Sequence, residues 1–291
     1  MSKRGKTVCL SPSFFVFLRA SHAAEHCLST GAFPFIYRHF RALGILAALV
    51  LLTACSQKSP PPTSRDVTLV TEDEYHIAAT LYPVSADHPP GLILVHGYGG
   101  NRHDWTAFAK RGQRAGYMSI AIDLRGHGAS AHQAGKSIDY HEFTKKDWMD
   151  TLHDIDAARK ELIKEGADPD NLAAVGASLG ANLVLHYALH HDDIQAVVMV
   201  SPGLDYHGIQ TEKAIQAYGK RPVMFVYATG DTYAASSAQR LKALATGYAE
   251  LREYQGAARG TDIFDRSLNA NEQIFTWLKP IIGPNRGGDK P

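Results

Sequence analysis

The sequence is poor in cysteine, and the few cysteines that it has stand near its beginning. Cys9, Cys27 and Cys55 all precede residue 56. The rest of the chain therefore has no pair of thiols for a disulfide and no thiol that could act as a nucleophile.

An excess of charge of one sign is missing as well. The chain has 30 Lys and Arg against 29 Asp and Glu, which gives a formal net charge of +1. This balance lacks the basic excess typical of proteins that bind nucleic acid. The sequence also lacks metal-ligand spacing and a phosphate-binding loop, and the run His190–Asp193 is typical of a solvated turn. We therefore expect no cofactor, no metal and no nucleic-acid partner.

A short apolar run at residues 42–52 follows basic residues at 38–41. The run is too short to cross a bilayer comfortably and suits the apolar region of a signal peptide. It closes in Leu52-Thr53-Ala54-Cys55, which resembles the lipobox of bacterial lipoproteins. In that family the cysteine becomes the lipidated first residue of the mature protein, so the resemblance implies a lipid on Cys55. A plain signal peptide or a signal anchor is the alternative.

The residues around this segment add two expectations. Residues 1–36 make the stretch before the apolar run longer than a signal peptide needs, so we expect translation to begin nearer Tyr37. Ser56 follows Cys55 where an Asp would mark retention in the inner membrane of Gram-negative bacteria, which favours the outer membrane. The expected location is the bacterial cell envelope, with the chain anchored through its lipid.

Composition divides the chain into four parts. Residues 1–54 form an N-terminal extension and lipoprotein signal peptide, and residues 55–65 form a tether rich in Pro and Ser. Proline disfavours both helix and sheet, so the tether is expected to be extended. Residues 66–283 make the folded domain, and residues 284–291 are expected to be a disordered tail.

Strands and helices alternate along the folded part. Continuous or alternating apolar runs predict eight strands: Val67–Val70, Ile77–Tyr82, Gly91–Val95, Tyr117–Ile122, Asn171–Ala177, Ile194–Val200, Pro222–Ala228 and Ala249–Tyr254. Helices are expected between them at Trp105–Ala115, Thr144–Glu165, Ile209–Tyr218, Ala235–Thr246 and Leu268–Ile282, with another directly after residue 178. This order predicts an α/β fold with a mostly parallel central sheet and helices on both faces.

The most informative stretch is Gly176-Ala177-Ser178-Leu179-Gly180, at the end of an apolar strand and the start of an apolar helix. A nucleophile elbow needs this context, because its tight turn holds a serine between small residues two positions before and after. The turn raises the Ser178 hydroxyl at the edge of the sheet. A purely structural Gly-Ser turn is the alternative reading.

With these motifs the chain, from about residue 65 to 283, resembles the α/β-hydrolase fold. It is most similar to bacterial alpha/beta hydrolases of the serine aminopeptidase-like and esterase branch. The matching segments are His96–Gly99, Asp123–Gly128, the elbow and Gly230-Asp231. They are specific for the fold and only weakly specific for the substrate.

The resemblance implies roles for single residues. Ser178 would be the nucleophile and Asp231 the acid of a triad, with Asp205 as the second candidate for the acid. The backbone N–H groups of Tyr98 and Leu179 would form the oxyanion hole. His96 and His127 are expected to be structural.

The base of the triad is missing. The family places a histidine in the loop after the last strand, where this chain has Arg259, and no histidine follows His207. A guanidinium stays protonated at physiological pH and cannot accept the proton of a serine. Arg259 is expected to pair with Asp231 or to recognise an anionic substrate group, and His207 and His103 are the other conceivable bases.

Two functions are compatible with these residues. The first is a membrane-anchored serine hydrolase that acts on small carboxylic esters or related acyl bonds. The second is a catalytically impaired, hydrolase-like binding protein of the cell envelope. The short segment from Pro202 to Arg221 leaves room for only a minimal cap, so an open and shallow site for a small-molecule substrate is expected. The sequence gives no expectation for the oligomeric state.

Overall fold

A computed structural model describes residues 62–267 and 269–284 of the chain. The predicted signal peptide, the lipidation site Cys55 and most of the tether lie outside these residues, as does the predicted tail beyond Pro284. None of the helices in the described part of the chain is both long enough and apolar enough to span a membrane.

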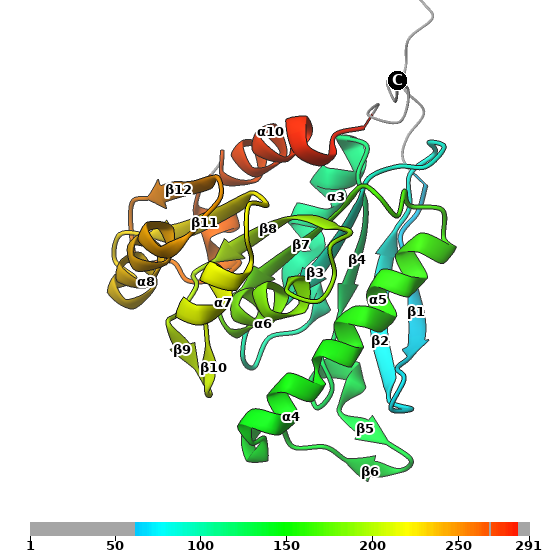
Figure 1. Cartoon of the computed structure of the whole chain (residues 1–291). Helices are drawn as coiled ribbons and strands as arrows, with labels where there is room; N and C mark the ends of the chain where they lie inside the picture. Colours follow the sequence, from blue (N-terminus) through cyan, green and yellow to red (C-terminus); the bar gives the residue numbers. More distant parts are fainter. Residues whose placement is uncertain (1–61, 268, 285–291) are drawn as a thin grey trace, which may run out of the picture. The chain divides into compact units, whose positions relative to one another are not determined.

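The centre of the domain is an eight-stranded sheet (Figure 1). Its order is β1-β2-β4-β3-β7-β8-β11-β12. β1 and β2 run antiparallel to each other, β2 runs antiparallel to β4, and the remaining neighbours are parallel. The strands are β1 (Arg65–Val70), β2 (His76–Tyr82), β3 (Gly91–Val95), β4 (Met118–Ile122), β7 (Leu172–Ala177), β8 (Ile194–Val200), β11 (Val223–Ala228) and β12 (Ala249–Tyr254). The predicted mostly parallel sheet is confirmed.

Helices cover both faces of the sheet, as predicted. Figure 1 looks onto the face covered by α5 (Leu152–Lys164), α6 (Leu179–Ala188) and α7 (Glu212–Ala217), which packs together with α8 (Thr232–Leu244). The opposite face carries α3 (Thr106–Arg114), α9 (Asp262–Arg266) and α10 (Ala270–Ile282). A hydrophobic core lies on each face of the sheet. Successive side chains of a parallel strand point to opposite faces, so they enter the two cores alternately.

Two details of the sequence prediction were wrong. The helix expected over Thr144–Glu165 is two helices, α4 (Lys145–Asp150) and α5, separated at Thr151. The Thr151 hydroxyl donates to the carbonyl oxygen of Trp148 at 2.6 Å, and this local hydrogen bond competes with the helical pattern. The helix expected over Ile209–Tyr218 is the shorter α7, preceded by the hairpin of β9 (Asp205–Tyr206) and β10 (Ile209–Gln210).

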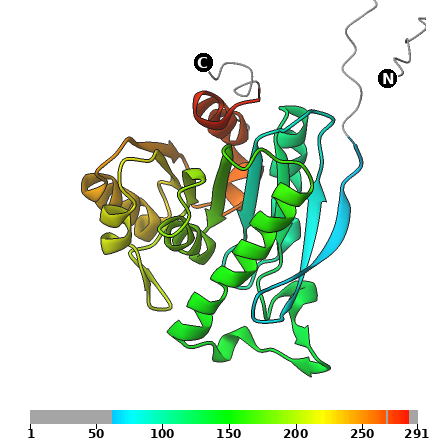
Figure 2. The same cartoon turned by 45° about the vertical axis from the view of Figure 1, so that its right-hand side comes forward.

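Several short elements were not predicted. They are α9, the hairpin of β5 (His132–Gln133) and β6 (Lys136–Ser137), and the 3₁₀ turns η2 (Arg102–Trp105), η3 (Gly128–Ser130) and η4 (Tyr140–Glu142). The β5–β6 hairpin and α4 extend from the lower end of the sheet in Figure 1, as the β9–β10 hairpin does (Figures 1 and 2). These segments surround the end of the sheet at which the parallel strands finish.

The described chain enters the domain at the other end of the sheet. Arg65, at the start of β1, pairs with Leu81, and the adjacent Tyr82 pairs with Ser119 near the start of β4. The side-chain amide of Gln113 donates to the carbonyl oxygen of Pro62 at 2.7 Å and to that of Pro83 at 2.5 Å. Residue 62 is therefore fixed at the edge where the parallel strands begin, and the carboxyl ends of those strands lie at the opposite edge.

Candidate active site

Ser178 occupies a strained turn between β7 and α6. Its φ of 53° and ψ of −120° lie outside the regions that L-residues ordinarily adopt. The Ser178 N–H donates to the carbonyl oxygen of Val200 on β8 at 2.7 Å, which ties the turn to the neighbouring strand. Its side chain is only partly buried, although the residues on both sides are buried.

The two glycines of the elbow have no room for a side chain. A Cβ atom at Gly176 would collide with the backbone of Gly180 and would lie 2.7 Å from the nitrogen of Ala181. A Cβ atom at Gly180 would collide with the backbone at the end of β3, where Val95 and His96 lie. Helix α6 can therefore begin close against the sheet only because both positions are glycine.

The loop after β3 passes directly beside Ser178. A Cβ atom at Gly97 would lie 3.1 Å from the Cβ atom of Ser178, and Gly99 has a φ of 72°. Within the described residues, neither the N–H of Tyr98 nor that of Leu179 donates a hydrogen bond to another backbone or side-chain group. Leu179 is the first residue of α6, so its N–H has no partner inside the helix. The arrangement leaves two donors available near the serine.

Two buried histidines support this loop from below. The Leu124 N–H donates to Nε2 of His96 at 3.0 Å, so Nδ1 of His96 carries the proton and donates to the carbonyl oxygen of Gly97 at 2.7 Å. His127 donates from Nδ1 to the carbonyl oxygen of Arg125 at 3.1 Å and stacks on Tyr140. Burial lowers the pKa of both imidazoles, that of His127 to about 4. Their structural role, expected from the sequence, agrees with these contacts.

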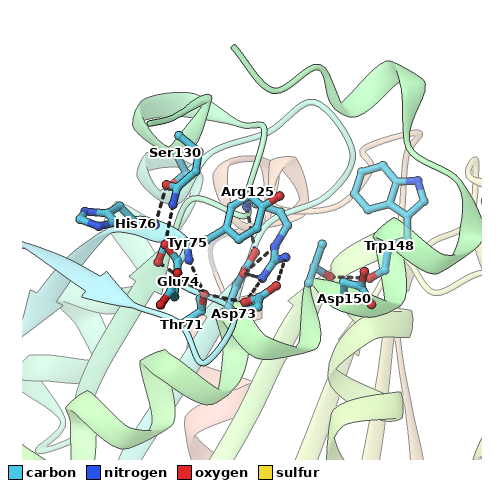
Figure 3. A network of polar contacts seen from close by, with 12 residues as sticks. Thr71, Asp73, Glu74, Tyr75, His76, Arg125, Ser130, Trp148 and Asp150 are labelled. Carbon is cyan, nitrogen blue, oxygen red and sulfur yellow. Dashed lines mark hydrogen bonds and ion pairs between the residues drawn. The ribbon is translucent and has the colours of Figure 1, made fainter. Parts of the chain in front are cut away.

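A buried ion-pair network fixes the loop that follows β4 (Figure 3). The Arg125 guanidinium donates to Asp154 at 2.7 and 2.9 Å and to Asp73 at 2.5 and 3.0 Å, and it lies over the ring of Tyr75. Hydrogen bonds from Arg125 and Thr71 lower the pKa of Asp73 to about 2 against the opposing effect of its burial. The network joins the turn between β1 and β2 to α5, and so holds the segment carrying His127 in place.

Asp231 is the N-cap residue of α8, and its carboxylate lies close to the guanidinium of Arg259. Its carboxylate caps the helix by accepting from the N–H of Ala234 at 3.4 Å, and its side chain is 5% exposed. The Arg259 Nε lies 3.6 Å from Oδ1 of Asp231, while 74% of the Arg259 side chain is exposed. The ion pair expected from the sequence is therefore present at the surface, and the capping role that competes with a catalytic role for Asp231 is also present.

The other candidates from the sequence have different surroundings. Asp205 is exposed, and its carboxylate accepts from the N–H of Gly208 at 2.7 Å inside the β9–β10 hairpin. His103 is exposed and acts electrostatically on Asp66 of β1. His207 stacks on the ring of Tyr98 with a centroid distance of 4.5 Å. None of the contacts described for these three side chains reaches Ser178.

The side chain that does approach Ser178 is one that the sequence analysis missed. Tyr206, on β9, is partly buried, its hydroxyl donates to the carbonyl oxygen of Ser201 at 3.4 Å, and the Ser178 side chain is among the groups that act on its pKa. The pKa of Tyr206 is raised by burial and by Asp231, while Ser178 and Arg259 act to lower it. Gly208, in the His207-Gly208 pair that separates Tyr206 from Ile209, is the sequence signal of the hairpin that brings Tyr206 here.

Aromatic rings form one wall of the site. Tyr98 is 41% exposed and contacts the rings of Tyr140, His141, Trp148 and His207 at centroid distances of 5.0, 6.0, 5.9 and 4.5 Å. These rings come from η4, α4 and the β9–β10 hairpin. They link the loop beside Ser178 to the hairpin that carries Tyr206.

No group of three or more His, Cys, Asp and Glu side chains in residues 62–267 and 269–284 is arranged to hold a metal ion. Three cavities of about 460, 530 and 330 Å³ are not lined by Ser178, Asp231 or Arg259, although the second borders the β9–β10 hairpin through Asp205 and Gly208. The residues around Ser178 thus offer a hydroxyl, two N–H donors, a phenol and an aromatic wall.

Comparison with known proteins agrees with this geometry. The model of the alpha/beta hydrolase fold family matches residues 90–239, which is just over half of the chain. The chain therefore belongs to the alpha/beta hydrolase fold family. Its mostly parallel central sheet with helices on both faces is the fold that the resemblance in the sequence predicted.

Individual relatives are distant. The chain is 27% identical over 138 residues to the thermostable monoacylglycerol lipase of Bacillus sp. (strain H-257), covering 47% of this chain and 50% of the relative. It is 31% identical over 114 residues to the pimeloyl-[acyl-carrier protein] methyl ester esterase of Vibrio atlanticus (strain LGP32), covering 39% of this chain and 36% of the relative. The chain thus spans half or less of the length of these curated relatives.

Among solved structures, a soluble variant of monoglyceride lipase from Saccharomyces cerevisiae superposes with a TM-score of 0.64. The superposition covers 78% of this chain and 98% of the lipase at 15% sequence identity. At this identity the similarity concerns the fold alone.

Proposed function

We propose that this protein is a serine hydrolase that acts on small carboxylic esters or related acyl bonds. In this proposal the Ser178 hydroxyl attacks the carbonyl carbon of the substrate. The N–H groups of Tyr98 and Leu179 stabilise the negative charge that develops on the carbonyl oxygen. Asp231 is the acid of the ancestral triad, and Arg259 stands at the position of its base.

The observation that carries the proposal is the conformation of Ser178. Glycine would adopt its φ of 53° and ψ of −120° without strain. In serine this conformation destabilises the folded protein by about 1–3 kcal/mol. A turn that served the fold alone would have no need of a hydroxyl at this point. The ester substrates in the names of the curated relatives support the same reaction class.

The expected rate is low, because a triad without its base loses most of its turnover. Removal of triad members leaves about 10³–10⁴-fold acceleration, which comes from the oxyanion hole and substrate binding. We expect hydrolysis of short, activated esters, since their alcohols leave without help from a general acid.

The second candidate function is a catalytically impaired, hydrolase-like binding protein of the cell envelope. It is favoured by Arg259, whose exposed guanidinium, 3.6 Å from Asp231, could bind a carboxylate or phosphate group from solution. This function would need the aromatic wall and the arginine but would not need the Ser178 hydroxyl.

The proposal includes a lipid anchor at Cys55. Pro62 lies at the edge where the parallel strands begin, and Ser178 follows the end of β7 at the opposite edge. Ser178 and Pro62, the first described residue, therefore lie at opposite ends of the central strands.

A fluorophosphonate probe tests the proposed function, because it labels only serines that act as nucleophiles. The full chain in detergent is treated with the probe, and the labelled peptide is identified by mass spectrometry. We expect labelling at Ser178 that is absent from Ser178→Ala. A wild-type protein that stays folded and unlabelled but binds small anions would favour the binding protein instead.

A further inference from the structure

We propose that Tyr206 is the group that takes the proton of Ser178, in place of the missing imidazole. The inference rests on the proposed function, since it concerns the nucleophile of the same site. It assigns Tyr206 to the reaction because the phenol lies at the end of β8, where the carbonyl oxygen of Val200 binds the N–H of Ser178 and that of Ser201 binds the Tyr206 hydroxyl.

The fold holds Tyr206 in place through the β9–β10 hairpin. His207 and Gly208, at the turn, have φ values of 52° and 83°, as the tightest two-residue hairpins require. Tyr206 pairs with Ile209, which is fully buried and anchors the ribbon in the core. The hairpin is thus a fixed part of the domain, although it has only two residues in each strand.

A clamp from α6 holds the hairpin beside the elbow. The amide of Asn182, one turn after Ser178, donates to the carbonyl oxygen of Ile209 at 2.8 Å and accepts from the N–H of Gly203 at 3.2 Å. Both ends of the segment that carries Tyr206 are therefore bound to the helix that begins at the nucleophile.

The ring of Tyr206 is fitted closely into this space. A Cβ atom at Gly203 would lie 2.6–2.9 Å from the ring, so only glycine leaves room for it. Tyr233 packs edge-on against the ring at a centroid distance of 5.6 Å. The Tyr206 hydroxyl points to the carbonyl oxygen of Ser201 at 3.4 Å, and the residue before Ser201 binds the Ser178 N–H.

The hydroxyl of Tyr206 is influenced by Ser178, Asp231 and Arg259, the three residues of the proposed site. The Ser178 side chain acts to lower the pKa of Tyr206, which is the direction expected when a serine hydroxyl donates to the phenol oxygen. Arg259 also favours the phenolate, whereas Asp231 and Tyr233 disfavour it. On the hairpin itself, the Asp205 carboxylate binds the N–H of Gly208, and His207 turns toward Tyr98.

The reaction then follows from one proton transfer. Once Tyr206 is ionised, its oxygen takes the Ser178 proton while Oγ forms a bond to the carbonyl carbon. The tetrahedral intermediate collapses, the bond to the alcohol oxygen breaks, and Tyr206 returns the proton to that oxygen. The phenolate next removes a proton from the water that attacks the acyl-enzyme, and Ser178 regains a proton as it leaves.

This assignment predicts activity that increases in alkaline solution. A phenol is a good base only when ionised, and burial together with Asp231 keeps the pKa of Tyr206 above its ordinary value. The fraction of active enzyme should therefore increase about tenfold for each pH unit up to the pKa of the phenol. An imidazole base would instead give a plateau above about pH 7.

The test measures the rate of fluorophosphonate labelling of the full chain between pH 7 and 10.5. In that reaction Oγ forms a bond to phosphorus, fluoride leaves, and Tyr206 takes the proton. We expect Tyr206→Phe to lower the rate at pH 10 by at least ~100-fold and to abolish its increase with pH. Arg259→Gln should move the increase to higher pH, because it removes a cation that favours the phenolate.

Tyr248→Phe is the matched control. Tyr248 is 57% exposed, its pKa is also raised, and it precedes β12 at the edge of the sheet away from Ser178. We expect this variant to keep the wild-type rate and profile. Circular dichroism at each pH checks that every variant remains folded.

The possible failures are distinct. An unchanged pH profile in Tyr206→Phe would overturn the inference and leave the serine hydrolase intact, provided that Ser178→Ala remains unlabelled. Equal labelling of Ser178→Ala and wild type would overturn the proposed function itself. A folded wild-type protein without labelling at any pH would also overturn the role of Tyr206.

Discussion

The two buried histidines under the active-site loop predict that the domain loses stability in mild acid. His127 has a pKa of about 4 in the folded protein against an ordinary value of 6.5. The unfolded chain therefore binds more protons than the folded one between these pH values, and stability decreases as the pH falls through this range. For His127 alone, the loss between pH 7 and pH 5 is about 2 kcal/mol.

The variant that isolates this effect is His127→Phe. A phenyl ring keeps the stacking on Tyr140 and loses one hydrogen bond to the carbonyl oxygen of Arg125, while Nε2 of His127 has no partner to lose. We expect the free energy of unfolding at pH 7 to change by no more than about 1 kcal/mol. Between pH 7 and pH 5 the variant should lose about 2 kcal/mol less than the wild type.

Urea denaturation at pH 7 and at pH 5, followed by tryptophan fluorescence, measures the free energy of unfolding at pH 7 and its loss between the two pH values. Trp105 and Trp148 are fully buried, so unfolding changes their surroundings. Burial raises the pKa of Asp154, so protonation of this carboxylate increases stability as the pH falls and opposes the effect of His127. The decisive number is therefore the difference between the losses of stability in the variant and in the wild type. His190→Asn, at an exposed position, should keep the wild-type response. An equal loss of stability in His127→Phe and in wild type would refute the reasoning.

Four further predictions follow from the site and the tether. Arg259→His should increase ester hydrolysis at pH 7.5 by at least ~100-fold, the lower end of general base catalysis, and an unchanged rate in a folded variant would contradict it. Ser178→Gly should relieve backbone strain and raise the free energy of unfolding by about 1 kcal/mol over Ser178→Ala, whereas equal stabilities would show that the turn is unstrained. Cys55→Ala should release the protein from the membrane fraction, and mass spectrometry that finds Cys55 without lipid in wild type would contradict the anchor. Deletion of residues 1–61, which leaves the Pro62 carbonyl oxygen bound by Gln113 in place, should change the Tm by no more than about 2 °C, and a large decrease would place the deleted segment in the fold.

The sequence predicts the central strands of the sheet well because they are buried on both faces. All five residues of Gly91–Val95 are buried, so the strand reads as an uninterrupted apolar run. The bounds expected for Ile194–Val200 and Ala249–Tyr254 agree with β8 and β12. The hairpins were missed because strands of two residues are too short to show any periodicity.

The site is predictable only where it depends on neighbouring strand ends. Gly97 and Ser178 follow β3 and β7, which are adjacent and parallel, so their loops must meet. Tyr206 could not be found in this way, because its position depends on a hairpin turn, on the clamp by Asn182 and on space left at Gly203. The exposure of Arg259 likewise depends on the path of a loop, which sequence patterns do not determine.

The residues of the site differ in how much they indicate about function. Asp231 caps α8 and pairs with Arg259, so the fold alone would explain its presence. The glycines of the elbow are needed for close packing of α6 on β3 whether or not the serine reacts. Ser178 is different, because its hydroxyl caps nothing and its backbone is strained. A strained residue that the fold does not need is best explained by chemistry at its side chain, and Tyr206→Phe is the variant that tests whether the neighbouring phenol takes part in that chemistry.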